Sequence, residues 1–131
     1  DEMPFDMNAP VIEILPEDYG IWFVDAMDHP ENYEGKTVKF KARVMKPRGM
    51  GSKFFVPGRT AMTCCADDTT FLGYVCKSAY APKLTPGEWV EVTAKVGIEK
   101  RNEYQGEEGI VLDAEHVEQC DPLEDEMVYF N

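Results

Sequence analysis

Strict alternation of apolar and polar residues in two segments limits what this chain can fold into. In residues 38–44, Val, Phe, Ala and Val alternate with Lys, Lys and Arg, and residues 90–96 repeat the pattern with Glu, Thr and Lys between apolar residues. Successive side chains of a β-strand point to opposite faces, so a period of two places one row in a core and the other in solvent. Both segments are therefore predicted to be half-buried strands.

Three further segments complete a five-strand pattern. Residues 54–65 and 71–80 are rich in β-branched and aromatic residues and are expected to be strands. The first is expected to be interrupted at Pro57-Gly58, and the polar turn ADDTT separates the two. Residues 110–120 form the fifth strand, whose phase shifts near residues 114–117, as at a β-bulge. Five short strands separated by turn signals predict a mainly β chain that forms a small antiparallel barrel.

One amphipathic helix is predicted near the N-terminus, at about residues 17–28. Pro16 suits the first helical position, and the two acids after it suit the positive end of the helix dipole. Aromatic residues then recur at helical spacing until Pro30 ends the pattern. The length of 131 residues fits one domain. We expect a flexible segment 1–10 and a single domain 11–131, with its barrel at about 36–120 and an acidic tail 121–131 that docks on the body.

Charge narrows the classes of function. The net charge of −12 argues against a general binder of nucleic acid or anionic membranes, because phosphate contacts need an excess of cations. Residues 1–35 carry ten acids and no Lys or Arg, whereas residues 36–59 carry eight Lys and Arg and no acid. No apolar run approaches the roughly 18 residues of a membrane span, and the N-terminus has no apolar signal segment.

The basic stretch 36–59 has two interpretations. It is a hairpin that binds an anion or an oligonucleotide, or it is the solvent face of a strand paired with acids such as Glu91. The second is favoured, because that face carries no interleaved aromatic residues for base stacking. No nucleic acid partner is expected.

Cys64 and Cys65 stand side by side, followed by Asp67 and Asp68. On a regular strand their side chains point to opposite faces, so they act together only if the chain bends there, and the turn sequence ADDTT favours such a bend. One interpretation is a site in which Cys64, Cys65, one of the two aspartates, with Asp68 preferred, and a distant ligand hold Zn²⁺ or another thiophilic metal or metalloid ion. The others are a redox-active vicinal disulfide and simple packing, with one thiol in the barrel and Asp68 capping the turn.

Four stretches of the sequence carry a resemblance to a known family: HPENYEGKTVKFKARV, GRTAMTCCADD, GEWVEVTAKV and a closing MVYF. From about Val11 to Phe130 the chain resembles the C-terminal domain of the YcgQ-like family of bacterial membrane-associated proteins. The resemblance implies an OB-fold-like five-stranded barrel, a membrane permease subunit as partner, and an extracytoplasmic, secreted or membrane-anchored location. The chain lacks the family's N-terminal membrane helices.

The most specific motif of the resemblance falls on Arg59, Cys64, Cys65 and Asp68. Family members often read Cys-Cys-x-Ala-Asp-Ala, and this chain has Asp67 in place of the first of those Ala residues. Arg59 and Asp68 are the expected ligand-binding residues. Arg59 has two interpretations: it pairs with Asp67 or Asp68 and holds the Cys-Cys turn, which is favoured, or it presents its fork to an anionic ligand.

Cys76 and Cys120 have a separate expected role. The third and fifth strands of an OB barrel run parallel, and the extracytoplasmic location that the resemblance implies favours a Cys76–Cys120 disulfide. The alternatives are two free thiols, or a metal site that His116 completes with one of them.

No catalytic motif is evident. The sequence has no Gly-rich phosphate loop, nucleophile-serine motif or HExxH, and His29 and His116 lie far apart. We therefore expect a non-enzymatic binding or accessory domain of a membrane transport complex, with no certain cofactor. A thiol-redox protein and an oligonucleotide- or anion-binding module are the alternatives.

Overall fold

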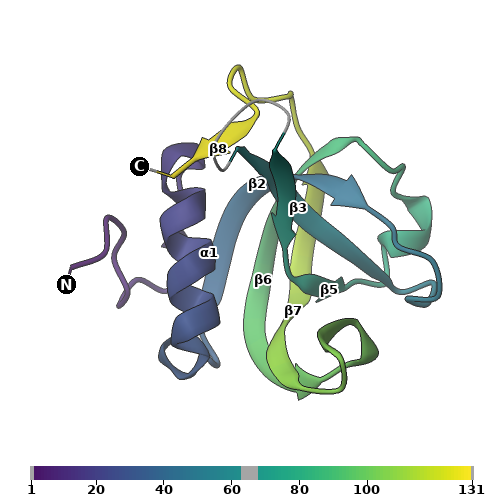
Figure 1. The fold of residues 1–131 in the computed structure, drawn as a ribbon, viewed down its shortest axis with the longest axis horizontal. Helices are drawn as coiled ribbons and strands as arrows, with labels where there is room; N and C mark the ends of the chain where they lie inside the picture. Colours follow the sequence, from purple (N-terminus) through teal and green to yellow (C-terminus); the bar gives the residue numbers. More distant parts are fainter. Residues whose placement is uncertain (1, 63–67, 131) are drawn as a thin grey trace.

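The computed structural model describes residues 2–62 and 68–130 (Figure 1). Its helix α1 packs beside a strongly curved β-sheet, and short 3-10 turns precede and follow the helix. The elements are β1 (Ile12–Glu13), α1 (Tyr19–Asp28), β2 (Thr37–Met45), β3 (Phe54–Met62), β4 (Thr69–Gly73), β5 (Val75–Lys77), β6 (Trp89–Lys100), β7 (Glu108–Gln119) and β8 (Met127–Tyr129), with 3-10 turns at Pro16–Asp18, Pro30–Asn32, Ala81–Lys83 and Asn102–Tyr104.

The sheet closes into a five-strand barrel. The hydrogen-bonded order runs β2, β6, β7, β5 and β3, and the β2–β3 pairing closes it. β5 and β7 run parallel, while the other neighbours in the barrel are antiparallel. β4 extends along β3 just before β5, so β4 and β5 together are the third strand of the predicted pattern. The predicted OB-fold-like barrel with one N-terminal helix is confirmed.

The predicted interruption at Pro57-Gly58 is wrong, because β3 runs unbroken through both residues. Pro57 lies opposite Val44 of β2. The amide of Val44 donates to Glu88 O, and its carbonyl accepts from the amide of Gly87, so both backbone groups of Val44 point away from β3. The missing N–H of proline is therefore not needed in this ladder.

Gly58 is required where β3 and β4 approach each other. It lies opposite Gly73, and a Cβ on Gly58 would lie 2.5 Å from the carbonyl oxygen of Leu72. The predicted bulge in β7 is present: Thr93 pairs with His116 while Ala94 pairs with Ala114, which leaves Glu115 as the extra residue.

Helix α1 supplies one wall of the core. Its buried face carries four residues at helical spacing, Tyr19, Trp22, Phe23 and Ala26. The Tyr19 and Trp22 rings pack against Phe40 of β2, with centroids 5.8 and 5.1 Å away. The hydroxyl of Tyr74 donates to the carbonyl of Phe23. The aromatic stripe found in the sequence is thus the contact between helix and barrel.

Both end segments contact this body. Near the N-terminus, Phe5 is buried in the core, and Lys36 Nζ donates to Met7 O over 2.9 Å. Near the C-terminus, β8 runs parallel to β3, and its Val128 is buried. Within 2–62 and 68–130, no helix has the length and apolar character to cross a membrane.

Candidate functional site

Arg59 of the family motif is an anchor inside the protein. Only 2% of it is exposed. Its Nη1 donates to Pro16 O over 3.1 Å, and Nε and Nη2 make longer contacts, 3.4 Å to Glu126 O and 3.5 Å to Met127 O. The guanidinium also lies over the Tyr19 ring, 5.6 Å from its centroid. One side chain therefore ties β3 to the start of the helix and to the C-terminal segment.

The environment of Arg59 is both buried and acidic. Burial lowers the pKa of Arg59, and the nearby Tyr19, Asp125 and Glu126 oppose that change. Burial also raises the pKa of Tyr19, whose hydroxyl donates to Leu72 O over 2.8 Å. The guanidinium thus donates inward to backbone carbonyls, which is a structural role for Arg59. Its expected pairing with Asp67 or Asp68 stays a prediction.

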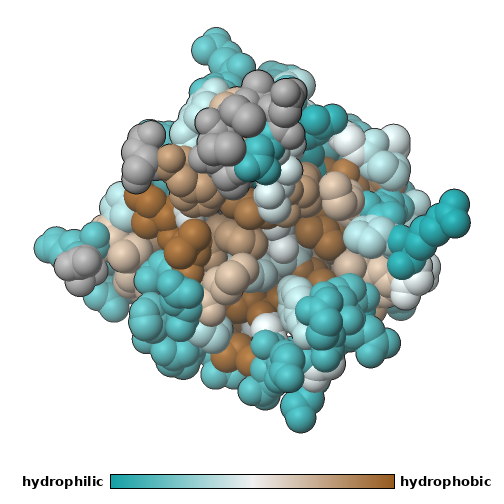
Figure 2. Space-filling model, in the orientation of Figure 1, coloured by the Kyte–Doolittle hydropathy of each residue, from teal (hydrophilic) through white to brown (hydrophobic). Residues whose placement is uncertain are grey.

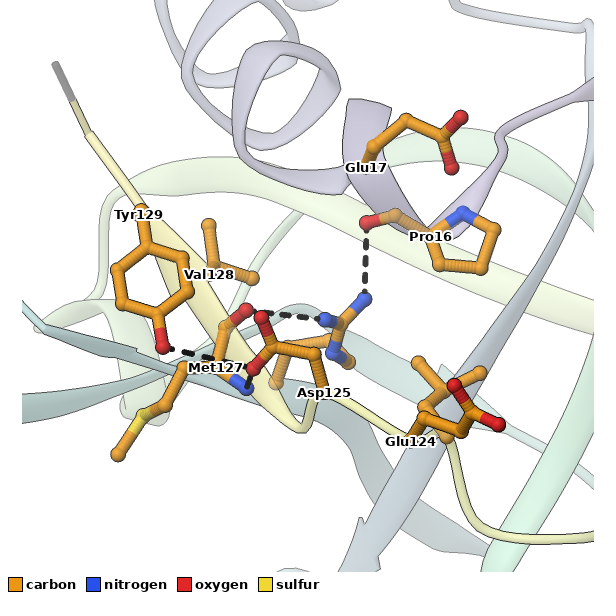
Figure 3. Close-up of a pocket in the computed structure, with 9 residues that line it drawn as sticks. Pro16, Glu17, Glu124, Asp125, Met127, Val128 and Tyr129 are labelled. Carbon is orange, nitrogen blue, oxygen red and sulfur yellow. Dashed lines mark hydrogen bonds between the residues drawn. The ribbon is translucent and has the colours of Figure 1, made fainter.

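A recess of about 440 Å³ opens beside Arg59 (Figure 3). We call it the Arg59 recess. It lies between the start of the helix, at Pro16 and Glu17, and residues 123–129 of the C-terminal segment. Asp125 Oδ1 accepts the amide of Met127 over 3.1 Å, which shapes the turn into β8. Acidic residues outnumber the single arginine among the residues of this recess, which suits a cation better than an anion.

The central part of the motif lies outside the described residues, since Cys64, Cys65 and Asp67 fall within 63–67. The residues on either side are placed. Met62, the last residue of β3, lies opposite Thr69 of β4 and Tyr129 of β8. Asp68 is exposed next to Thr69. Arg59, Met62 and Asp68 therefore lie toward the same end of β3. Tyr129, which pairs with Met62, also lines the Arg59 recess.

The expected Cys76–Cys120 disulfide requires correction. Both residues are free thiols. The predicted parallel pairing is present and sets Cys76 opposite Leu112 of β7, but Cys120 lies eight residues beyond Leu112 along the chain. At about 3.3 Å per residue this separation is on the order of 25 Å, whereas a disulfide needs Cα atoms within about 7 Å. The two strands are neighbours, but the cysteines lie at different positions along the strand direction.

The alternative metal site with His116 has no support in the described residues. His116 lies on β7 opposite Thr93. Within residues 2–62 and 68–130, no group of three or more His, Cys, Asp and Glu side chains is arranged to hold a metal ion. Burial strongly raises the pKa of Cys76, and the nearby Asp113 adds to this, so Cys76 behaves as a core residue.

The basic stretch is largely engaged in contacts within the protein. Lys39 Nζ lies 3.7 Å from Glu91 Oε1 across the β2–β6 pair. Arg43 Nε donates to Gly87 O over 3.2 Å, and Lys46 Nζ donates to the carbonyls of two residues in the 81–84 turn. These contacts agree with the interpretation of this stretch as the solvent face of a strand.

The sequence did not point to the C-terminal segment as a wall of the site. Residues 123–129 contribute most of the Arg59 recess. The only signal was the apolar triplet Val128, Tyr129 and Phe130 after an acidic run. That pattern predicts docking on the body, but it does not show which strand receives the segment.

The closed barrel with a parallel β5–β7 pair defines a small OB-fold-like β-barrel domain, with the motif arginine three residues before the end of β3. The chain belongs to the family described as the DUF1980 C-terminal domain, whose sequence profile matches residues 1–130. This membership agrees with the resemblance to YcgQ-like proteins. No curated protein sequence matches the chain.

Several solved structures are similar in part. The mitochondrial single-stranded DNA binding protein Rim1 of S. cerevisiae is 10% identical with a TM-score of 0.38, over 67% of this chain and 97% of that chain. Aspartyl tRNA synthetase from Entamoeba histolytica is 17% identical with a TM-score of 0.42, over 79% of this chain and 21% of that chain. A deletion mutant of the single-stranded DNA binding protein from Thermus aquaticus is 16% identical with a TM-score of 0.36, over 68% of this chain and 42% of that chain.

Proposed function

We propose that the chain is a non-enzymatic binding and accessory domain of a membrane transport complex, with a membrane permease subunit as its partner. The domain is located outside the cytoplasm. Cys64, Cys65 and Asp68 hold a thiophilic metal ion, with Zn²⁺ as the first candidate, and Arg59 supports the segment that carries them. Two thiolates and a carboxylate are a donor set that suits Zn²⁺.

The observation that carries this proposal is the position of Arg59. Arg59 is buried and donates to three backbone carbonyls, which holds β3 in place three residues before the strand ends at Met62. Cys64 and Cys65 follow shortly after this end in the sequence. Asp68, the described member of the donor set, is an exposed residue just before β4. A rigidly held strand next to the donor residues is what a preorganised binding site requires. The acidic Arg59 recess nearby favours a cation.

Metal content tests the proposed site. Protein purified under reducing conditions without chelator is expected to contain about one equivalent of metal by elemental analysis. The Cys64→Ser/Cys65→Ser variant should lose that metal, whereas Cys120→Ser should keep it. A metal-free protein whose Cys64 and Cys65 do not react with thiol reagents would exclude both the metal site and thiol redox chemistry. A metal-free protein with a reducible Cys64–Cys65 bond would instead favour the redox alternative.

Location and partner need separate measurements. A membrane-impermeant maleimide applied to intact cells should label Cys120, which is only partly buried, if the domain lies outside the cytoplasm. Labelling only after lysis would contradict the extracytoplasmic place. Copurification with the permease subunit after detergent extraction, and its absence with an unrelated membrane protein, tests the partnership.

A further inference from the structure

A second hollow lies on the outer side of α1, away from the core. We call it the helix groove. Its volume is about 570 Å³, and it runs between the helix and the last residues of the chain. Its lining includes Glu17, Ile21, Val24, Asp28, Tyr129 and Phe130. The motif residues Arg59 and Asp68 do not line it.

Large apolar side chains are exposed along the helix groove. Ile21, Val24, Tyr129 and Phe130 are each between 42% and 53% exposed. Figure 2 shows hydrophobic side chains over the upper part of α1, beside the end of the chain. Single exposed hydrophobic residues are ordinary, but a contiguous group marks an interaction surface. The other face of α1 is buried in the core, so the helix is apolar on two sides. A helix whose outer face only meets solvent usually carries polar residues there.

The floor of the helix groove is built by close packing. A Cβ on Gly20 would lie 2.7 Å from Val128 Cγ1 and 3.1 Å from Phe130 Cε1. The absence of a side chain at Gly20 therefore lets the C-terminal segment lie against the helix. Val128 is buried and β8 is hydrogen-bonded to β3, so the apolar wall is held in place by the barrel.

The rim of the helix groove is acidic. Glu17, Asp25 and Asp28 line it together with His29, and none of the Lys and Arg residues within 2–62 and 68–130 does. The whole N-terminal part of the chain has the same bias, because residues 1–35 carry ten acids and no Lys or Arg. A second copy would set acid against acid, and an anionic bilayer would be repelled. Charge complementarity therefore favours a cationic occupant.

We propose that the helix groove docks a basic amphipathic helix of a partner protein. Glu17, in the 3-10 turn before α1, and Asp28, the last residue of α1, are eleven residues apart, about 17 Å at about 1.5 Å per residue. The matching ligand is a helix of about three turns, with apolar residues at i, i+3 or i+4, and i+7 for the groove. Lys or Arg near its two ends faces the acids. The docked helix belongs to the partner of the accessory role proposed above, but its binding does not require the metal.

A designed helix tests this docking. The probe is a fluorescein-labelled peptide of about 18 residues, long enough to form a helix, that contains only Leu and Lys with all leucines on one face. A second peptide of the same composition has its leucines scattered. Fluorescence anisotropy should show tighter binding of the amphipathic peptide. Ile21→Ser/Val24→Ser should weaken that binding at least about tenfold, and Met45→Ser/Tyr80→Ser, which changes exposed apolar residues elsewhere, should not.

Salt dependence tests the charged rim separately. Glu17→Gln/Asp28→Asn should reduce the effect of salt on the affinity more than Glu107→Gln/Glu108→Gln, which removes the same charge where the β6–β7 connection enters β7. All these variants change exposed residues, so an unchanged urea midpoint should show that each remains folded.

Four results would overturn the proposal. The first is equal binding of the scattered peptide, and the second is equal loss of binding in the two apolar variants. The third is a dimer in solution that Ile21→Ser/Val24→Ser dissociates, which would make a second copy the occupant. The fourth is binding to phosphatidylcholine vesicles that the same variant abolishes. Loss of metal in Cys64→Ser/Cys65→Ser with unchanged peptide binding separates this docking from the metal site.

Discussion

Replacing Arg59 with Met should destabilise the domain and release its C-terminal strand. Met keeps an apolar stem of similar length but removes every hydrogen-bond donor. The contact with Pro16 O, at 3.1 Å, has a normal length, whereas those with Glu126 O and Met127 O, at 3.4 and 3.5 Å, are long. Hydrogen bonds to charged groups contribute about 1.5–3 kcal/mol each at good geometry.

The expected magnitude follows from these contacts. One good charged hydrogen bond, two weak ones and about 1 kcal/mol from the cation–π contact with Tyr19 give a loss of about 2–4 kcal/mol in the free energy of unfolding. This is a large part of the about 5–15 kcal/mol typical of a domain. Urea denaturation measures the loss, and hydrogen exchange at the β8 amides should show local opening first.

Arg43→Met is the matched control. Arg43 also contacts residue 126, with Nη1 3.6 Å from Glu126 Oε1, but 42% of its side chain is exposed. Such exposed pairs contribute about 0–1 kcal/mol. Arg43→Met also removes the hydrogen bond to Gly87 O, but water reaches this exposed side chain and can replace the lost contacts, so its loss should be smaller than that of Arg59→Met. Equal losses in the two variants, or unchanged exchange at β8 in Arg59→Met, would refute the assignment of Arg59 as the anchor of the C-terminal segment.

Three further perturbations have expected outcomes. Gly58→Ala should cost more than about 2 kcal/mol in urea denaturation, because its Cβ meets backbone of β4, and Gly97→Ala, where the nearest atom is at 3.4 Å, should cost less. Tyr104→Phe should cost about 1–3 kcal/mol by the same assay, since its hydroxyl accepts an amide of β5 at 2.9 Å and donates to a β7 carbonyl at 2.7 Å; no change would mean that water replaces it. In the folded protein at pH 8, iodoacetamide should modify Cys120 but not Cys76, as peptide mass spectrometry can show. Burial raises the pKa of both thiols, so modification of Cys120 should speed up as pH rises, whereas Cys76 should react only after unfolding.

Local sequence determined the strands and the helix. The alternation in residues 38–44 and 90–96 corresponds to β2 and β6, and the phase shift near Ala114 marks the bulge in β7. These signals are readable because strand and helix periodicity depend on near neighbours in the chain. Pro57 misled the prediction because its effect depends on the partner strand, whose hydrogen bonds point elsewhere.

The sequence also located the candidate motif, but it did not show whether its arginine is buried or which groups it contacts. A pattern of Arg, Cys, Cys and Asp fits both an anion fork and a structural pair. Only the packing of β3 against the start of the helix and the C-terminal segment shows Arg59 buried and bonded to carbonyls 43 to 68 residues away in the chain.

Tertiary structure alone decided the register and the surfaces. The parallel pairing of the strands that carry Cys76 and Cys120 was foreseeable, but the vertical offset that separates the two thiols was not. The helix groove exists because residues 127–130 return to pack on Gly20. Periodicity shows which face of an element is apolar. Which distant segment covers that face, and which part stays open for a partner, depends on contacts that the whole fold must form together.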